Sequence, residues 1–319
     1  MRKLNKEIIV FFHEGTLNGK AGAYAAWKIF QNSAHYEGVD YCTLENLHTY
    51  DVSGKTVYII GLSIAMRNLD TLVYSADKVY FIDHHPGTKH IAESFDPSIR
   101  KKLEVIHSSN RASCCLAWSH FVDDQPVPQL FLAIEDMQVR QSNPTVPNSY
   151  FICMGLSVHF DFISLNTFFQ NNLERLRNTE SVAKLINDGH HYYKFIESLV
   201  NSYNNRAEYY DILDKQVPIL NIPKTFVEGC LTILASKCGI ALSYTDTGNK
   251  RYWSVRTLPE SKLHAGKISE LMEGGGSLYV GGFTTSTKIL PDDLQELFKT
   301  RMSESVNSKK SIRITEQES

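Results

Sequence analysis

The residues with the clearest capacity for chemistry are Asp83, His84 and His85, which directly follow the apolar run Val79–Ile82. A buried strand of a parallel sheet has this composition, and ligands of such sheets gather beyond the carboxyl ends of the strands. Imidazole beside carboxylate suits a transition-metal ion. The segment therefore predicts a metal site or, because histidine pairs also occur in solvated turns, a polar turn without a ligand.

A second kind of chemistry is offered by Arg256 and by Gly274, Gly275 and Gly276. Glycine lets backbone amides approach an anion closely, and arginine binds phosphate through two parallel hydrogen bonds. Glycine is also common where a helix ends and a strand begins. This segment predicts either phosphate binding or a tight structural turn.

These residues need a scaffold, and the first half of the chain alternates apolar runs with helical patterns, which predicts βαβ units and a parallel sheet. The expected strands are Glu7–His13, Val39–Leu44, Thr56–Leu62, Lys78–Asp83 and Leu103–His107. The expected helices are Ala21–Gln31, Arg67–Ser75, Asn110–Asp123 and Val127–Gln138. Apolar spacing over 147–210 predicts a helical stretch, and strand-like runs after Asp211 predict a smaller α/β domain.

The expected organisation is an α/β domain over residues 1–145, a helical connector over 146–210 and a smaller α/β domain over 211–301. The last stretch, 302–319, is polar and lacks aromatic residues, which predicts a disordered tail.

Composition limits the partners. The 319 residues carry 33 Lys+Arg against 35 Asp+Glu, a formal charge of -2, so no basic surface for long duplex nucleic acid is expected. The longest early apolar run, Ile8–Phe12, is too short for a signal peptide or a membrane span, which predicts an intracellular, cytoplasmic protein. Six cysteines without a CxxC pair indicate neither a disulfide framework nor a thiolate zinc site. A homo-oligomer remains open.

Two segments together resemble one family. Ile82–His85 resembles the name-giving motif of the DHH phosphoesterases, and Gly274–Phe283 resembles the glycine-rich signature of their associated DHHA1 domain. The resemblance covers roughly residues 7 to 300 and implies a parallel-sheet DHH-like domain, a helical connector and a smaller α/β DHHA1-like domain that closes over a cleft. Tyr252–Arg256 resembles the DHHA1 strand that ends in a substrate-facing arginine.

In active members, the resemblance implies, two manganese or magnesium ions activate a water against a phosphodiester or phosphoanhydride. One histidine, His85, falls on the position that faces the phosphate and is the expected catalytic residue. The positions that match metal ligands are His13, His84 and Asp136, with Asp83 and Asn18 as weaker candidates.

Two acidic positions of the family pattern are missing from this chain. Asn18 stands where an anionic ligand is expected, and Gly61 stands where an aspartate bridges the metals. In the glycine-rich signature, Ser277 or Leu278 replaces a histidine. Two divalent cations about 4 Å apart repel by about 16 kcal/mol at an effective dielectric near 20, so they need several carboxylates. The sequence therefore predicts that a conventional two-metal site does not assemble.

The expected function is binding of a nucleotide or short oligonucleotide in the interdomain cleft, with two-metal hydrolysis lost or weakened and with one Mn²⁺ or Mg²⁺, or none. Such a protein is a pseudoenzyme of the phosphoesterase fold. One alternative is an active metal-dependent phosphodiesterase or oligoribonuclease with a one-metal or rearranged site. The other is a non-catalytic scaffold for protein interactions.

Overall fold

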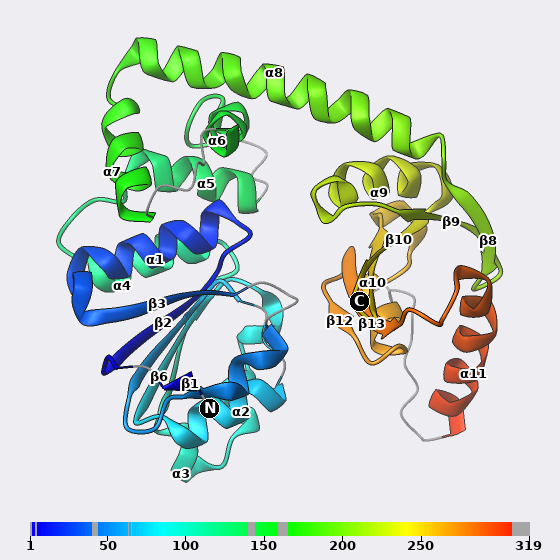
Figure 1. Cartoon of the computed structure of the whole chain (residues 1–319), viewed down its shortest axis with the longest axis horizontal. Helices are drawn as coiled ribbons and strands as arrows, with labels where there is room; N and C mark the ends of the chain where they lie inside the picture. The colour runs from blue at the N-terminus through cyan, green and yellow to red at the C-terminus, as the bar shows by residue number, and fades with distance from the viewer. Residues whose placement is uncertain are drawn as a thin grey trace. The chain divides into compact units, whose positions relative to one another are not determined.

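The computed structural model describes residues 2–3, 5–39, 44–62, 64, 66–139, 144–158 and 165–307. The chain divides into two compact units, Met1–Tyr193 and Lys194–Ser319 (Figure 1). The boundary falls inside α8, the 26-residue helix Thr179–Asn204. None of the described helices is long and apolar enough to cross a membrane.

The first unit is built on a five-stranded sheet in which every neighbouring pair is parallel. The strand order is β3-β2-β5-β6-β7. These strands are β2 (Ile8–His13), β3 (Ala34–Val39), β5 (Thr56–Ile60), β6 (Lys78–Asp83) and β7 (Leu103–His107). The order reverses between β2 and β5, which is where ligands bind in doubly wound sheets, outside the carboxyl ends of the strands. The predicted α/β class with a parallel sheet is confirmed.

Helices cover both faces of this sheet (Figure 1). Side chains of β2 alternate between the faces, because Val10 and Phe12 belong to one core cluster and Ile9 and Phe11 to the other. The first cluster is closed by α1 (Leu17–Phe30), α4 (Ser113–Phe121), α5 (Gln129–Val139), α6 (Ser149–Val158) and α7 (Leu165–Arg175). The second is closed by α2 (Met66–Ser75) and the short α3 (Pro97–Arg100), and a two-stranded ribbon pairs β1 (Arg2–Lys3) with β4 (Tyr50–Asp51).

The helix after β2 begins four residues before its predicted start. Thr16 caps it, because its Oγ1 accepts a hydrogen bond from the Gly19 amide at 3.1 Å. Gly19 is required there, since a β-carbon at this position would lie 2.2 Å from the carbonyl oxygen of His13. The glycine therefore lets the first turn of α1 sit directly against the end of β2.

The strand predicted at Val39–Leu44 is wrong in position, because β3 spans Ala34–Val39. Among the described strands, β3 lies at the edge of the sheet and pairs with β2, and four of its six residues are half-buried. Its mixed sequence, Ala-His-Tyr-Glu-Gly-Val, lacks the continuous apolar run of a central strand. Residues 40–43 of the prediction lie outside the described residues.

The second unit is built on a six-stranded mixed sheet in the order β12-β13-β11-β10-β9-β8. The β9–β10 pair is parallel and the other neighbouring pairs are antiparallel. The strands are β8 (Glu208–Ile212), β9 (Lys215–Asn221), β10 (Ile240–Thr247), β11 (Lys250–Thr257), β12 (Gly275–Gly276) and β13 (Val280–Ser286). The sequence predicted a smaller α/β unit in this part of the chain, and its first strand begins at Glu208, before the predicted start at residue 211.

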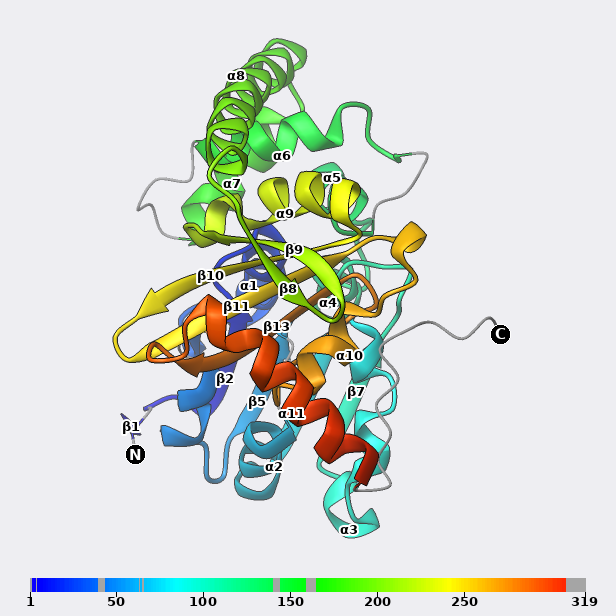
Figure 2. The ribbon, with the colours of Figure 1, turned by 90° about the vertical axis from the view of Figure 1, so that its right-hand side faces the viewer.

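Helices of the described part of the second unit cover its sheet (Figure 2). Apolar side chains of α9 (Lys224–Cys238) form one core cluster, and those of α10 (Ala265–Glu270) and α11 (Leu294–Asn307) form another with the opposite set of strand residues. The last helix continues to Asn307, past residue 302, where the tail is predicted to begin. The rest of that predicted tail, residues 308–319, lies outside the described residues.

Candidate functional site

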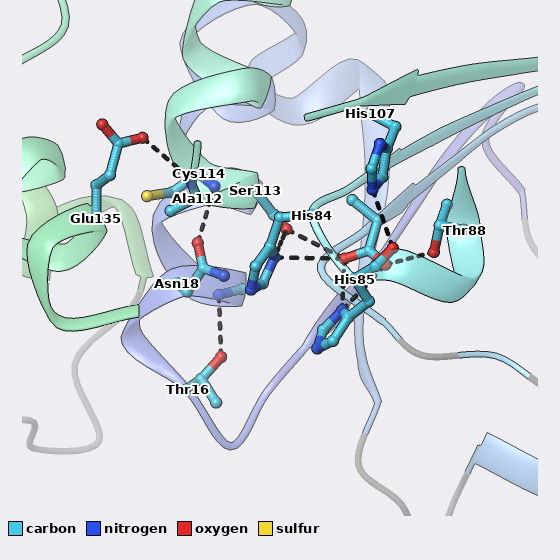
Figure 3. A network of polar contacts seen from close by, with 12 residues as sticks. Thr16, Asn18, His84, His85, Thr88, His107, Ala112, Ser113, Cys114 and Glu135 are labelled. Carbon is cyan, nitrogen blue, oxygen red and sulfur yellow. Dashed lines mark hydrogen bonds and ion pairs between the residues drawn. The ribbon is translucent and has the colours of Figure 1, made fainter. Parts of the chain in front are cut away.

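The centre of the candidate site is the carboxylate of Asp83, the last residue of β6, which has no solvent exposure. Its Oδ1 accepts hydrogen bonds from Nδ1 of His85 at 2.8 Å and from Oγ of Ser113 at 3.2 Å (Figure 3). Its Oδ2 accepts a hydrogen bond from Oγ1 of Thr88 at 2.6 Å and lies 3.0 Å from Nδ1 of His85. Both oxygens of the carboxylate are therefore engaged in hydrogen bonds that orient the side chains of His85, Thr88 and Ser113.

Both imidazoles face the network through Nδ1. Nδ1 of His84 lies 2.7 Å from Oγ of Ser113 and 3.5 Å from Oδ1 of Asp83. The two rings lie 4.4 Å apart between centroids. Among the described residues, Nε2 of neither ring takes part in a hydrogen bond, and the His85 side chain is 39% exposed. Each ring thus keeps one nitrogen for a ligand.

The negative charge of Asp83 and a positive charge on His85 stabilise each other. Burial favours the neutral form of Asp83, but the two imidazoles and the Thr88 hydroxyl together favour the anion more strongly and hold the pKa of Asp83 well below its usual value of 3.8. Burial also opposes the charged form of His85, but the hydrogen bond to Asp83 and its negative charge raise the pKa of His85 above 6.5. The pair is a buried anion beside a partly exposed base.

The position expected to hold a bridging aspartate is occupied by Gly61, directly after β5. Its amide donates to the carbonyl oxygen of Ile82 at 3.0 Å, and its φ of 63° is in the left-handed region. A β-carbon there would lie 3.4 Å from Cβ of Ser113 and 3.8 Å from Nδ2 of Asn18. A side chain at residue 61 would therefore point into the candidate site, and this chain supplies none.

Asn18, the second position without its expected acid, is buried and joins two helices. Its Oδ1 accepts a hydrogen bond from the backbone N–H of Cys114, in the first turn of α4, at 2.9 Å. The Ala112 amide at the same helix end donates to Oε2 of Glu135 at 2.9 Å, and Nε of Arg111 lies 2.8 Å from that oxygen. Side chains from α1 and α5 thus satisfy the amino end of α4, which needs such acceptors.

Two predicted metal ligands, His13 and Asp136, are not members of the cluster that Asp83, His84 and His85 form. Among the described residues, the group of possible ligand atoms within 4.8 Å of one another consists of Asp83, His84 and His85, and it includes neither His13 nor Asp136. The two oxygens of Asp136 accept backbone hydrogen bonds from residues 145 and 146 at 3.0 and 2.8 Å. This carboxylate holds the loop after α5, and its role as a metal ligand stays a prediction.

The predicted phosphate-binding residues of the second unit have structural partners. Arg256 on β11 is buried, and its guanidinium lies 3.4 Å from Oε1 of Glu228 on α9. β-Carbons at Gly274 and Gly276 would lie 2.1 Å from the carbonyl oxygen of Gly282 and 2.2 Å from that of Val280, so both glycines are required by packing. Gly275 alone has nothing within 4 Å of such an atom. Phosphate binding at these residues stays a prediction.

Sequence reasoning missed Ser113, Thr88 and His107. Ser113 reaches Asp83 across 30 positions, Thr88 reaches it from the turn after β6, and Nε2–H of His107 donates to the carbonyl oxygen of His85 at 3.0 Å. The one available signal was the parallel sheet itself, because His107 ends β7, the neighbour of β6. No local motif marks the two hydroxyls.

Comparisons with known proteins agree with this architecture. No family model and no curated protein matches the sequence, whereas 33 chains of solved structures match the fold. The DHH domain of a protein described as a member of a family of ribosomal proteins has a TM-score of 0.56 and 11% identity, over 92% of this chain and 86% of that one.

Two further structures are similar. RecJ from Thermus thermophilus in complex with Mn²⁺ has a TM-score of 0.49 and 13% identity, over 95% of this chain and 52% of that chain. The pGpG-specific phosphodiesterase PggH from Vibrio cholerae has a TM-score of 0.45 and 10% identity, over 95% of this chain and 98% of that one. At these identities the likeness concerns the fold alone. The chain has a DHH-type fold, as the motif resemblance predicted.

Proposed function

We propose that this protein binds a phosphate-bearing ligand, a nucleotide or a short oligonucleotide, at the carboxyl edge of the parallel sheet, and that it lacks two-metal hydrolysis. The observation that carries the proposal is the contrast between the intact Asp83–His84–His85 network and the bare position 61 beside it. The network keeps His85, the residue predicted to contact a phosphate. The carboxylates that would neutralise two cations are missing at positions 18 and 61.

The retained residues can bind an anion. In its charged form, His85 donates Nδ1–H to Asp83 and keeps Nε2–H for a phosphate oxygen. The side chain is exposed enough to reach a ligand, and the buried carboxylate fixes its orientation. His85 therefore supplies a charged, oriented donor.

The residues do not fit two metal ions. A bridging carboxylate is absent at Gly61, Asn18 is neutral, and the oxygens of Asp83 are engaged by four short contacts with Thr88, Ser113 and His85. Repulsion of about 16 kcal/mol between two divalent cations then lacks compensation. At most one Mn²⁺ or Mg²⁺ is expected, with His84, His13 and Asp136 as its predicted ligands.

The test uses the purified chain after treatment with EDTA. We expect the dinucleotide pGpG or the mononucleotide GMP to raise the melting temperature without metal, because a ligand that binds only the folded state stabilises it. Chromatography should detect no product with Mn²⁺ added, and elemental analysis should find at most one ion per chain. Two ions per chain together with turnover would falsify the proposal, as would an unchanged melting temperature with both nucleotides.

A matched pair of variants locates the binding. His85→Ala should remove the nucleotide-induced shift in melting temperature. His90→Ala should retain it, because His90 is an exposed histidine whose Nδ1 likewise lies 3.0 Å from a carboxylate, that of Glu93, outside the network. Equal loss of the shift in both variants would show that the candidate site is not where the nucleotide binds.

A second candidate function is a one-metal phosphodiesterase, because three possible ligand atoms of Asp83, His84 and His85 lie within 4.8 Å of one another. It predicts one bound Mn²⁺ and slow, Mn²⁺-dependent loss of pGpG that His84→Ala abolishes. If Mn²⁺ binds but pGpG is not cleaved, the phosphodiesterase function is excluded and the ligand-binding function is retained.

A further inference from the structure

We infer that one buried carboxylate fixes the tautomer of both imidazoles in the candidate site: Asp83 acts on His85 directly and on His84 through the hydroxyl of Ser113. Ser113 is therefore a positioning residue. The inference rests on the proposed function only in what it says about ligand binding, because the proton positions are a property of the ligand-free protein.

The geometry places Ser113 between two partners. Its Oγ lies 2.7 Å from Nδ1 of His84 and 3.2 Å from Oδ1 of Asp83, and the residue is fully buried in the first turn of α4. A serine hydroxyl has one proton and two lone pairs, so it donates to one of these partners only. The other contact needs a proton from the partner.

Only one order of protons satisfies every group. If Ser113 donates to Asp83, its lone pair accepts Nδ1–H of His84, and each contact contains one proton. If Ser113 instead donates to His84, its lone pairs face the anionic Oδ1 at 3.2 Å with no proton between the two oxygens. Because an ionised carboxylate is an acceptor only, the first order is the one that the buried site supports.

This proton order determines the state of the other nitrogen, Nε2, in both rings. Nδ1–H of His84 and Nδ1–H of His85 point into the network, so each neutral ring carries its lone pair on Nε2. Each of the two neighbouring rings, whose centroids lie 4.4 Å apart, thereby offers a nitrogen lone pair to a metal ion or to the acidic proton of a ligand. Ser113 is fully buried, so its hydroxyl positions the two rings and does not reach a ligand.

The test is nitrogen NMR of histidine-labelled, metal-free protein at alkaline pH, with signals assigned from His84→Gln and His85→Gln. The expected spectrum of the unmodified protein shows both rings with the pyrrole-type nitrogen at Nδ1 and the pyridine-type nitrogen at Nε2. A pyridine-type signal at Nδ1 of His84 would overturn the inference without any variant at Ser113.

Variants then separate positioning from simple structural support. In Ser113→Ala, His84 keeps only the longer contact of its Nδ1 with Oδ1 of Asp83 at 3.5 Å, so its Nδ1–H signal should weaken and its tautomer should shift towards the Nε2–H form, while His85 stays unchanged. Ser113→Thr, which keeps the hydroxyl, should restore the original spectrum. Ser243→Ala is the matched control, because Ser243 is equally buried in the second unit and its Oγ has no hydrogen bond among the described residues.

The two proposals fail separately. Unchanged His84 tautomers in Ser113→Ala, with a nucleotide-induced melting shift still present, would refute the inference and leave the binding function intact. The expected tautomers in a protein that binds neither pGpG nor GMP would refute the binding function and leave the inference intact.

Discussion

The side-chain oxygen of Asn18 accepts a hydrogen bond from the backbone N–H of Cys114 at 2.9 Å, across 96 positions of sequence. This contact joins the first turn of α1 to the first turn of α4 at the carboxyl edge of the sheet. An aspartate at position 18 would keep the accepting oxygen and add a negative charge. The neutral amide thus retains the structural contact and gives up the charge that a cation needs.

Restoring both acids should therefore restore metal binding. We expect Asn18→Asp combined with Gly61→Asp to raise the number of Mn²⁺ ions bound per chain to two, because the new carboxylate at 61 would point towards Ser113 and Asn18. The left-handed φ of 63° costs an aspartate about 1 to 2 kcal/mol, which the fold should tolerate. Calorimetric titration with Mn²⁺ measures the stoichiometry.

The control for this pair is Gly61→Asn in the unmodified chain, which adds the same bulk without charge. It should leave Mn²⁺ binding as it is. If the asparagine and the double-aspartate variants bind Mn²⁺ equally, missing charge is not what limits the site.

Removing the Thr88 hydroxyl should destabilise the first unit. Thr88→Val keeps the shape but takes one donor from the buried Asp83 anion, whose Oδ2 lies 2.6 Å from Oγ1 of Thr88. A hydrogen bond to a charged group contributes about 1.5 to 3 kcal/mol, so unfolding in urea should begin at lower concentration.

Thr245→Val provides a matched comparison. Its Oγ1 donates to the carbonyl oxygen of Ile222, also at 2.6 Å, but this acceptor is neutral. The expected loss is about 1 kcal/mol. A loss as large as that of Thr88→Val would indicate that Asp83 is not charged in the folded protein.

The Asp246–Arg251 pair should make the second unit sensitive to acid. Two hydrogen bonds of 2.7 and 2.8 Å from the Arg251 guanidinium hold the pKa of Asp246 below 3.8. A carboxyl group whose pKa is lowered by folding contributes stability above its unfolded pKa and loses it as pH falls through the folded value. Asp246→Asn should therefore lower stability at pH 7 and make little difference at the acid end.

The size of this effect is limited, because the Asp246 side chain is 38% exposed, so we expect less than about 1 kcal/mol. Hydrogen exchange of the β10 and β11 amides at pH 7 and at a pH well below 3.8 measures it. A difference between variant and parent that grows as pH falls would contradict the sign worked out above.

Two glycines of the second unit allow packing to be separated from binding. A β-carbon at Gly281 would lie 2.3 Å from Oγ of Ser269 and 2.5 Å from the carbonyl oxygen of Ala265, so Gly281→Ala should destabilise by about 2 kcal/mol or more. Gly275→Ala adds a methyl group to open space and should leave the melting temperature within about 1 °C of the parent value.

Gly275→Ala also tests the predicted phosphate contact. If the Gly275 backbone binds a phosphate, the nucleotide-induced melting shift should shrink in this stable variant. An unchanged shift would indicate that the Gly275 backbone does not contact the phosphate.

The central strands were predictable from sequence because burial on both faces gives continuous apolar runs. Lys78–Asp83, a central strand, was predicted at the bounds that the structure shows. The edge strand Leu103–His107 was also predicted at its bounds, because Leu103, Val105 and Ile106 keep it apolar although most of its residues are only half-buried. The edge strand Ala34–Val39 was missed because only its ends are buried. The true start of α1 was missed because its glycines favour a loop in sequence, and only the contact with β2 explains them.

The site was predictable where residues are neighbours in sequence and not where they meet through the fold. Asp83, His84 and His85 form one motif at a strand end, and the structure brings them together. The Ser113 hydroxyl enters from α4, and the direction in which Asp136 points on α5 depends on the loop that follows. Helix position alone does not give these orientations.

The carboxylate shared by His84 and His85 makes the two histidines compete. When a cation or proton binds Nε2 of one ring, its Nδ1–H becomes a stronger acid and draws more electron density from Asp83. Less density then remains to support a second charge on the other ring. A cation or proton bound to one imidazole should therefore lower the affinity of the other imidazole for a second cation. The two histidines should then not each bind a cation, even where space allows it.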